Sequence, residues 1–292
     1  MSEQPVIALD VGGSSIKSGL VATGPRILGG VQMRSIDSRA GAAEILQTLA
    51  AVIAGHFESC RDARGIAIAF PGPFDYEQGI CLMRGQEKYD ALYGINLSAG
   101  LKEIPGMPDL EIRYRNDAEA AIVGEALYGA GGRFSRLLGV TLGTGLGSAF
   151  LSDGAIITEG AGVPDHGWLY SQPSGTGNAD DMFSSRGLLA RLRGHGIRAA
   201  DLASAISMAK QEDQALRAAF ASFGLDLGTF LKPFVSDFRA DGVLVTGGIA
   251  EAWDWFGPAL VQSLTVPVVK GTLGKAAPLV GGAALYLWRT AA

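Results

Sequence analysis

The pattern of apolar and polar positions opens with a hairpin. Residues 5–9 form a continuous apolar run that ends at Asp10, and an extended pattern resumes over residues 15–21. Two glycines and a serine, at 12–14, form the tip between them. Apolar runs joined by a short glycine turn are typical of antiparallel strands. Because glycines let backbone N–H groups face outward and Lys17 adds a cation, the tip is either an ordinary turn or a cradle for a phosphate chain.

The same pattern returns about half a chain later. Residues 135–143 and 146–151 are apolar runs, and Gly143, Thr144 and Gly145 stand between them. Two matching hairpins at this separation are what an internal duplication would produce. We therefore expect two α/β units of common plan, each built on a mixed sheet whose first strands form the hairpin.

The rest of the pattern alternates helices with short strands. Apolar residues at helical spacing predict a set of helices, at 40–57, 181–193, 201–208, 211–238 and 276–289. Short apolar runs predict strands at 65–70 and 242–246. The stretches 75–107 and 157–180 are irregular and polar, which suggests that they line a binding site. His56 and His195 fall near helix ends and are expected on the surface.

One strand-to-helix corner places an acid at the junction. Residues 111–115 alternate like an edge or half-buried strand, and residues 118–127 are helix formers with an apolar stripe, so Asn116 and Asp117 lie between the two. A carboxylate at a helix start can cap the helix. It can equally take a proton from a substrate hydroxyl. The corner alone leaves both interpretations open.

Two further turns are rich in glycine. Pro71, Gly72 and Pro73 end a predicted strand sharply, and such a stiff turn either holds backbone amides against a ligand or only stops the strand. Gly247 and Gly248 open a helix after another predicted strand. Backbone N–H groups at such a helix start favour an anion or a closely approaching nucleotide.

The composition is that of a globular protein. Hydrophobic residues make up 48% and charged residues 18% of the 292, which is neither the charge excess of disorder nor the apolar blocks of a membrane protein. This length has room for two domains. A net charge of −5, without a local basic patch, argues against a nucleic-acid partner. The 42 glycines are the outlying number and indicate tight turns and close backbone approach to ligands.

The N-terminus and the cysteines bear on location. Residues 1–10 lack the basic start and long apolar run of a signal peptide or membrane anchor. Cys60 and Cys81 form neither a disulfide framework nor a close metal-ligand spacing. We therefore expect a cytoplasmic protein with reduced thiols and no membrane partner.

Taken in order, these segments resemble the ROK family of bacterial sugar kinases and related repressors, within the actin-like, sugar-kinase ATPase superfamily. The resemblance spans nearly the whole chain. It rests on six segments, which are modest singly and specific in this order: ALDVGGSSIKSGLV, AIAFPGPFD, RNDAEAAIVGEALYGAG, LLGVTLGTGLGSAFLSDG, GVLVTGGIAE and KAAPLVGGAAL.

The resemblance implies a two-lobed actin-like, ribonuclease H-like α/β fold with duplicated mixed sheets. The smaller lobe would hold residues 1–117 and 276–292, and the larger lobe residues 118–275. The implied activity is ATP-dependent transfer of the γ-phosphate to a hydroxyl of a hexose or hexose derivative, with closure of the lobes excluding water. Magnesium would be required, and the resemblance also implies a homodimer.

Roles for individual residues follow from the matching positions. Asp117 would be the general base, and Asp10 the acid that holds magnesium through water. The residues expected to contact the sugar are Pro71, Gly72, Asn96, Asn116, Asp117, Asp165 and Asp181. The residues expected to bind the nucleotide are Asp10, Gly12, Gly13, Ser14, Ser15, Lys17, Gly143, Thr144, Gly145, Gly247 and Gly248.

The chain departs from the family at its zinc site. Many members carry a Glu-x-Gly-His segment and a C-x-C-G-x-x-G-C cluster, whose histidine and cysteines hold structural zinc. Here residues 165–168 read DHGW, Trp168 stands where the zinc histidine would be, and no cysteine follows Cys81. The resemblance therefore implies a zinc-free branch. Asp165 stands where the Glu-x-Gly-His segment of the family has its glutamate, and its side chain is shorter. Asp181 stands for another glutamate of the family. The alignment of both positions with the family is open.

Three other functions compete with a kinase. A sugar-responsive regulator would need a DNA-binding module, and the first strand begins by Val6, which leaves no room before it for a helix-turn-helix. The altered residues 165–168 suggest a sugar-binding protein without turnover. Asp117 and the glycine tips of both hairpins argue against it. An activator of a radical enzyme would need cysteines at iron–sulfur spacing, which are missing. The sugar, its reacting hydroxyl and the choice of ATP or polyphosphate stay open.

Overall fold

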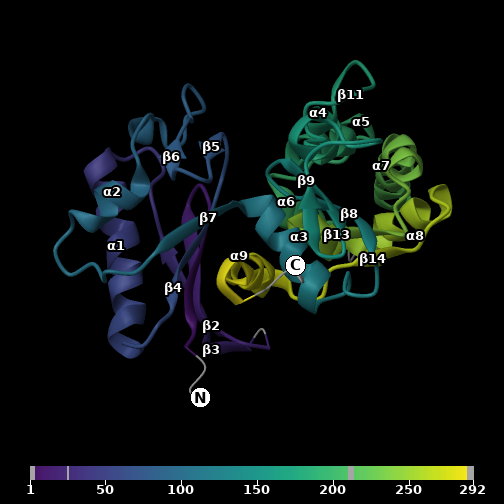
Figure 1. Cartoon of the computed structure of the whole chain (residues 1–292). Coiled ribbons are helices and arrows are strands. Elements are labelled where there is room, and N and C mark those ends of the chain that lie inside the picture. The colour runs from purple at the N-terminus through teal and green to yellow at the C-terminus, as the bar shows by residue number, and fades with distance from the viewer. Residues whose placement is uncertain (1–3, 25, 210–213, 288–292) are drawn as a thin grey trace. The chain divides into compact units, whose positions relative to one another are not determined.

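The computed structural model describes residues 4–24, 26–209 and 214–287, and its chain forms two compact units (Figure 1). The first comprises Met1–Gly124 and Lys275–Ala292, and the second Glu125–Gly274. The sequence-based division, after residue 117 and before residue 276, stays a prediction. In the structure the chain leaves the first unit within a helix, after Gly124.

The first unit is built on a five-stranded sheet of order β3-β2-β1-β4-β7. Its strands are β1 (Val6–Val11), β2 (Ser15–Ala22), β3 (Arg26–Ser35), β4 (Gly65–Phe70) and β7 (Ile112–Asn116). β1, β4 and β7 run parallel, whereas β2 is antiparallel to β1 and to β3. β1 and β4 are buried along their whole length and form the centre of the sheet. β7 is an edge strand, as its alternating pattern predicts.

Helices cover both faces of this sheet (Figure 1). Outside the sheet, the first unit contains α1 (Ala42–Ser59), β5 (Phe74–Asp75), β6 (Ile80–Cys81), η1 (Asp90–Leu92), α2 (Leu97–Lys102) and α9 (Ala277–Leu287). Ile7, Leu9 and Val11 belong to the core on the α1 side. α9 packs on β1, β4 and β2. A continuous apolar strand is therefore buried because helices lie on both of its faces.

The second unit repeats the plan with a sheet of order β10-β9-β8-β13-β14. Its strands are β8 (Arg136–Leu142), β9 (Leu146–Ser152), β10 (Ala155–Ile157), β13 (Gly242–Thr246) and β14 (Val268–Lys270). Strand directions match those of the first sheet, because β8, β13 and β14 are parallel and β9 is antiparallel to β8 and to β10. The expected pair of mixed sheets with a common plan is confirmed.

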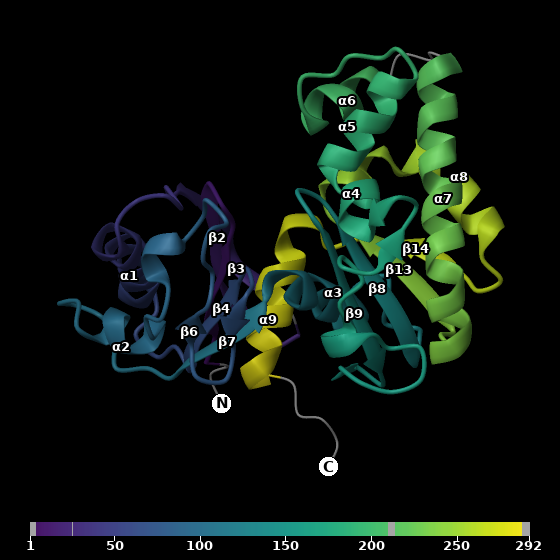
Figure 2. The same ribbon diagram turned by 90° about the horizontal axis from the view of Figure 1, so that it is seen from above.

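Helices of the second unit share one hydrophobic core with its sheet. They are α4 (Ala179–Phe183), α5 (Ser185–Gly194), α6 (Leu202–Ala209), α7 (Gln214–Phe238), η3 (Gly248–Ala252) and α8 (Trp253–Ser263). Short pieces complete the unit: η2 (Asp165–Gly167), β11 (Pro173–Ser174) and β12 (Gly177–Asn178). α7 and α8 lie side by side (Figure 2). α7 supplies buried side chains to the core along most of its length, among them Phe220, Phe223 and Leu227.

Most predicted elements are present, with a few differences. The predicted helix at 181–193 is two helices, because Ser184 is extended and its hydroxyl caps α5. β3 was not predicted, since most of its side chains are exposed and carry no alternation. The predicted start of α7 at residue 211 and the predicted end of α9 at residue 289 lie outside the described residues. None of the described helices combines the length and apolar character needed to cross a bilayer.

The prediction for His56 is wrong. It is 5% exposed, and its Nε2 lies 2.9 Å from the Ser18 hydroxyl on β2. Burial lowers the pKa of this imidazole. The side of α1 that carries His56 faces the sheet, so His56 is a core residue. His195 is exposed, as predicted.

Candidate functional site

The carboxyl ends of β1, β4 and β7 lie at one edge of the first sheet. Asp10 is in register with Ala69, and Phe70 with Asn116. Asp10, the turn that follows Phe70 and the corner at Asp117 are thereby brought to the same edge. Ligands of open α/β sheets bind outside the carboxyl ends of parallel strands. This edge is the candidate site of the first unit.

Asn116 caps helix α3 (Asp117–Tyr128). Its Oδ1 accepts the backbone N–H of Ala118 at 3.0 Å and of Glu119 at 3.2 Å. Its Nδ2 donates to the Tyr76 hydroxyl at 2.9 Å, and that hydroxyl donates to the carbonyl of Phe70. An asparagine amide has two donor hydrogens, so one remains for a ligand. Capping, which was considered for Asp117, is therefore mainly the task of Asn116.

Asp117 keeps most of its hydrogen-bonding capacity. Its Oδ1 accepts the Ala118 N–H at 2.9 Å. Burial raises the pKa of the Asp117 carboxyl, and the charge of Asp10 raises it further; the Ala118 N–H and the charge of Lys88 act in the opposite direction. A raised pKa makes a carboxylate a stronger base near neutral pH. The side chain therefore has the chemistry of a proton acceptor.

The first hairpin tip carries an ion pair. Lys17 Nζ lies 2.5 Å from Asp10 Oδ2, and the two residues face each other in the β1–β2 register. The tip closes through a hydrogen bond from the Gly12 N–H to the Ser15 carbonyl at 2.9 Å. A Cβ on Gly13 would meet its nearest atom only at 4.0 Å, so the outer side of this tip is open. Lys17, predicted to face phosphate, is already engaged with Asp10.

Asp10 suits a magnesium ion held through water. It is 7% exposed, and its Oδ2 is the oxygen that Lys17 occupies. Oδ1 accepts no hydrogen bond from any residue that the structure describes. Magnesium is usually bound by one or two carboxylates together with water and phosphate oxygens. One free carboxylate oxygen is therefore enough to hold the ion through water. Among the described residues, no three histidine, cysteine, aspartate or glutamate side chains gather into a metal cluster.

Two other predicted sugar contacts, Asn96 and Gly72, interact with neighbouring residues. Asn96 caps α2 by accepting the Ala99 N–H at 2.9 Å, and its Nδ2 donates to the Gln78 carbonyl at 2.6 Å. Gly72 precedes a cis bond to Pro73. A Cβ on Gly72 would lie 3.2 Å from the Tyr76 hydroxyl. The turn is thus packed against the residue that bonds to Asn116, and its role toward a sugar stays a prediction.

The second hairpin tip exposes neutral donors. The Gly143 N–H donates to the Gly145 carbonyl at 3.1 Å, and the Gly143 carbonyl accepts the Ser185 N–H at 2.7 Å. The backbone N–H groups of Thr144 and Gly145 donate to no acceptor in the described part of the chain. A Cβ on Gly143 would meet nothing within 4 Å. Unused N–H groups beside open space can bind an anion such as phosphate.

Asp180 is a site residue that the sequence analysis missed. Its Oδ1 accepts the Leu146 N–H at 2.7 Å, directly after the second tip. The predicted sugar contact is its neighbour Asp181. The structure gives Asp181 a capping box with Asn178 and a 2.8 Å ion pair with Arg186. Both acids stand at the start of α4, so sequence position alone does not distinguish them.

The loop after β13 requires glycine for packing. Gly247 has φ 96°, and a Cβ there would lie 2.5 Å from the carbonyl oxygen of Leu142. Thr246 is in register with Thr141, so this loop runs beside the second tip. Gly248 begins η3 directly afterwards. The turn at Gly247 and Gly248 and the second hairpin tip, both predicted to bind the nucleotide, therefore share one edge of the second sheet.

Asp165 lies in η2 and is exposed. The next residue, His166, has φ 57°, and its ring centroid is 4.6 Å from that of Trp168. The structure thus stacks the two aromatic residues of the DHGW segment, and leaves the sugar contact predicted for Asp165 as a prediction.

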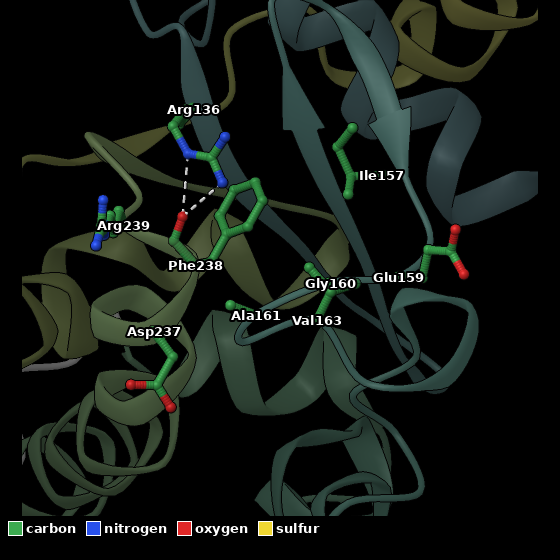
Figure 3. Close-up of a pocket in the computed structure, with 9 residues that line it drawn as sticks. All are labelled: Arg136, Ile157, Glu159, Gly160, Ala161, Val163, Asp237, Phe238 and Arg239. Atoms are coloured by element: carbon green, nitrogen blue, oxygen red, sulfur yellow. Dashed lines mark hydrogen bonds between the residues drawn. The ribbon is translucent and has the colours of Figure 1, made fainter.

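A pocket of about 420 Å³ lies elsewhere in the second unit (Figure 3). Its lining residues are Arg136, Ile157, Glu159, Gly160, Ala161, Val163, Asp237, Phe238 and Arg239. Arg136 donates two hydrogen bonds to the Phe238 carbonyl, at 3.0 and 2.7 Å, and its guanidinium lies over the Phe238 ring. Arg136 begins β8, whereas the glycine tip follows the end of β8. The pocket is therefore separate from the candidate site, and none of the predicted site residues lines it.

Comparison with known proteins agrees with the resemblance. The model of the ROK family matches residues 6–287. The chain is 27% identical over 176 residues to a glucokinase of Thermotoga maritima, covering 60% of this chain and 53% of the relative. It is 29% identical over 172 residues to a beta-glucoside kinase of Listeria innocua, covering 58% and 54%. The chain thus spans about half the length of these curated relatives.

Solved structures share the fold over nearly the full length. One is the crystal structure of a ROK family glucokinase from Streptomyces griseus in complex with glucose and AMPPNP, with a TM-score of 0.76 and 22% identity. The superposition covers 96% of this chain and 98% of that one. The predicted fold is confirmed: two mixed five-stranded sheets in the actin-like ATPase arrangement of ROK structures.

Proposed function

The chain belongs to the ROK family, and we propose that it is a sugar kinase that transfers the γ-phosphate of ATP to a hydroxyl of a hexose or hexose derivative. The observation that carries the proposal is the division of labour at the corner of β7 and α3. Asn116 caps the helix, which leaves Asp117 as a partly buried carboxylate of raised pKa. Such a group is suited to accept the proton of a sugar hydroxyl.

Phosphoryl transfer needs alignment and charge neutralisation more than covalent help from the protein. In the proposed reaction Asp117 accepts the proton of the sugar hydroxyl, and the sugar oxygen bonds to the γ-phosphorus. The bond from that phosphorus to the bridging oxygen breaks, and its electron pair leaves with ADP. Magnesium, when bound through water on Asp10, would offset charge on the phosphate oxygens.

The second unit would hold the nucleotide. The free N–H groups of Thr144 and Gly145 suit phosphate oxygens, and the loop at Gly247 and Gly248 suits the adenosine. The names of the relatives support a sugar as acceptor: one is a glucokinase and another a beta-glucoside kinase. We propose a hexose or its glucoside, without choosing between them.

A coupled phosphorylation assay tests the proposal. The purified protein would be given ATP or polyphosphate, magnesium, and a panel of hexoses, β-glucosides, amino sugars and N-acetylated sugars. We expect formation of a sugar phosphate from one class of sugar, with release of ADP when ATP is the donor. No sugar-dependent turnover with any donor would contradict the proposal, and sugar binding by calorimetry without turnover would favour a binding protein instead.

Two finer expectations accompany the kinase. We expect no bound zinc, because the zinc histidine and cysteines of the family are missing together. Elemental analysis with about one zinc per chain would contradict this. We also expect a homodimer, which light scattering of the purified protein would test.

A further inference from the structure

The basic side chains around Asp117 differ in their salt-bridge and hydrogen-bond partners. Lys17 is paired with Asp10 at 2.5 Å. Arg115 donates from Nη1 to the Gly281 carbonyl in α9 at 2.6 Å, and its charge acts on Glu119. Lys88 forms no salt bridge or hydrogen bond through its ammonium group within the described residues. Its charge nevertheless acts on Asp117.

The backbone around Lys88 is unusually constrained. Glu87 and Tyr89 on either side have φ of 58° and 56°, a left-handed conformation that is unfavourable for a non-glycine residue. Such strain persists only where surrounding contacts hold it, and it is concentrated at functional sites. Two strained residues thus flank one half-buried lysine.

Tyr89 fixes this segment to the first hairpin. Its hydroxyl donates to the Gly12 carbonyl at 2.6 Å, and its N–H donates to the Ser38 carbonyl at 2.6 Å. Its ring is fully buried, with a centroid 5.0 Å from that of Phe70, the last residue of β4. Lys88 is therefore held beside the tip of the first hairpin and the carboxyl end of β4.

The acidic neighbour of Lys88, Glu87, pairs with another residue. Glu87 pairs with Arg39 at 3.0 Å, and Arg39 Nε also donates to the Glu87 carbonyl. The groups that act on Asp117 are then Asp10 from β1, Lys88 from its loop, Tyr76 directly after β5, and Glu119 on α3 itself. Lys88 is the cation in this group that has no fixed partner.

We propose that Lys88 is a further catalytic residue, whose ammonium group contacts the phosphoryl group during its transfer to the sugar. The proposal rests on the proposed kinase function. As the sugar oxygen bonds to phosphorus and the bridging oxygen departs with ADP, negative charge spreads over the three equatorial phosphoryl oxygens. A preorganised cation in a partly buried site stabilises that charge more strongly than water does. Lys17 is poorly suited to this task, because Asp10 already neutralises it.

The test compares Lys88→Met, Lys88→Arg and Lys102→Met, using the sugar that the assay panel identifies. Lys102 is an exposed lysine at the end of α2 and serves as the matched control. We expect Lys88→Met to lower kcat by about 10²–10³-fold, with the KM of sugar and ATP changed less than about threefold. Lys88→Arg should recover at least about a tenth of the parent rate, and the control should match the parent. Melting temperatures should agree among all four proteins.

A second readout does not depend on turnover. ADP with aluminium fluoride mimics the planar phosphoryl group, so its affinity in the presence of sugar reports transition-state contacts. Lys88→Met should weaken binding of ADP with aluminium fluoride by about the same factor as kcat, and leave ADP alone unchanged. Parent-like kcat and fluoride binding in Lys88→Met would overturn the role of Lys88. An inactive parent protein would instead overturn the proposed function, so the two failures are distinguishable.

Discussion

The two hairpin tips have the same strand order behind them and different chemistry on them. The first carries an acid and a lysine in register, Asp10 and Lys17, on strands buried in the sheet. The second, at residues 143–145, has no charged residue of its own and relies on Asp180 for support. Duplication can thus preserve a backbone while the side chains take separate tasks.

The difference suggests how the reaction is divided. Charged groups gather in the first unit: Asp10, Asp117 and Glu119, with Lys17 and Lys88. Proton transfer and metal binding need such groups. Neutral N–H donors at the second tip suit phosphate oxygens without demanding a change in protonation. The next three predictions test this division, from the largest expected effect to the smallest.

Asp10→Asn should have the largest effect of these. The variant keeps the size of the side chain and removes the charge that pairs with Lys17 and would hold magnesium through water. We expect kcat to fall by about 10²–10³-fold, because magnesium neutralises charge worth several kcal/mol in the transition state. The measurement is turnover across a range of magnesium concentrations. A rate within a few-fold of the parent at every concentration would remove Asp10 from the metal site.

Gly143→Ala and Gly247→Ala should separate binding from packing within the second unit. Gly247 has φ 96° and its Cβ would strike the Leu142 backbone, so we expect a loss of about 2–4 kcal/mol in unfolding free energy. Gly143 has open space, so Gly143→Ala should change stability by less than about 1 kcal/mol. If phosphate approaches this tip, Gly143→Ala should raise the KM for ATP about tenfold. Unchanged KM with unchanged stability would show that the second tip binds nothing closely.

Glu119 should make the stability of the first unit depend on pH. Burial raises the pKa of this carboxyl to about 7, and the charge of Asp117 contributes in the same direction, against the charge of Arg115. The folded state then binds more protons than the unfolded state between about pH 4.5 and 7, so stability should be greatest below that window and fall as pH rises through it. We expect a loss of about 2 kcal/mol between pH 5 and 8. Denaturant unfolding of the parent and Glu119→Gln checks this, since the variant should lose that part of the slope.

Much of the architecture could be predicted because it is local. A continuous apolar run such as 65–70 or 242–246 fits a strand covered on both faces, and both predicted strands have these bounds in the structure. The glycine tips can likewise be predicted from their residue types. β3 escaped prediction, because its mostly exposed side chains impose no pattern on the sequence.

What could not be predicted depends on partners far along the chain. Asn and Asp are equally good helix caps, and the choice of Asn116 is coupled to Tyr76, 40 residues earlier, whose hydroxyl accepts one N–H of the Asn116 side-chain amide. The burial of His56 depends on Ser18, 38 residues away on β2. Lys88 is distinguished by Arg39, which takes the neighbouring acid. No spacing in the sequence reveals such pairs.

The division between capping and catalysis at the corner is the centre of the account. Asp117→Asn should lower turnover by about 10²–10⁴-fold, the usual worth of a positioned general base, and leave the melting temperature nearly unchanged because Asn116 still caps α3. Asn116→Ala should instead lower the unfolding free energy by about 1 kcal/mol. The direct measurement is turnover and melting temperature on the same preparation of Asp117→Asn. A stable Asp117→Asn protein with turnover at least about a hundredfold below the parent is the predicted result, and one that keeps more than about half of the parent rate would contradict the account.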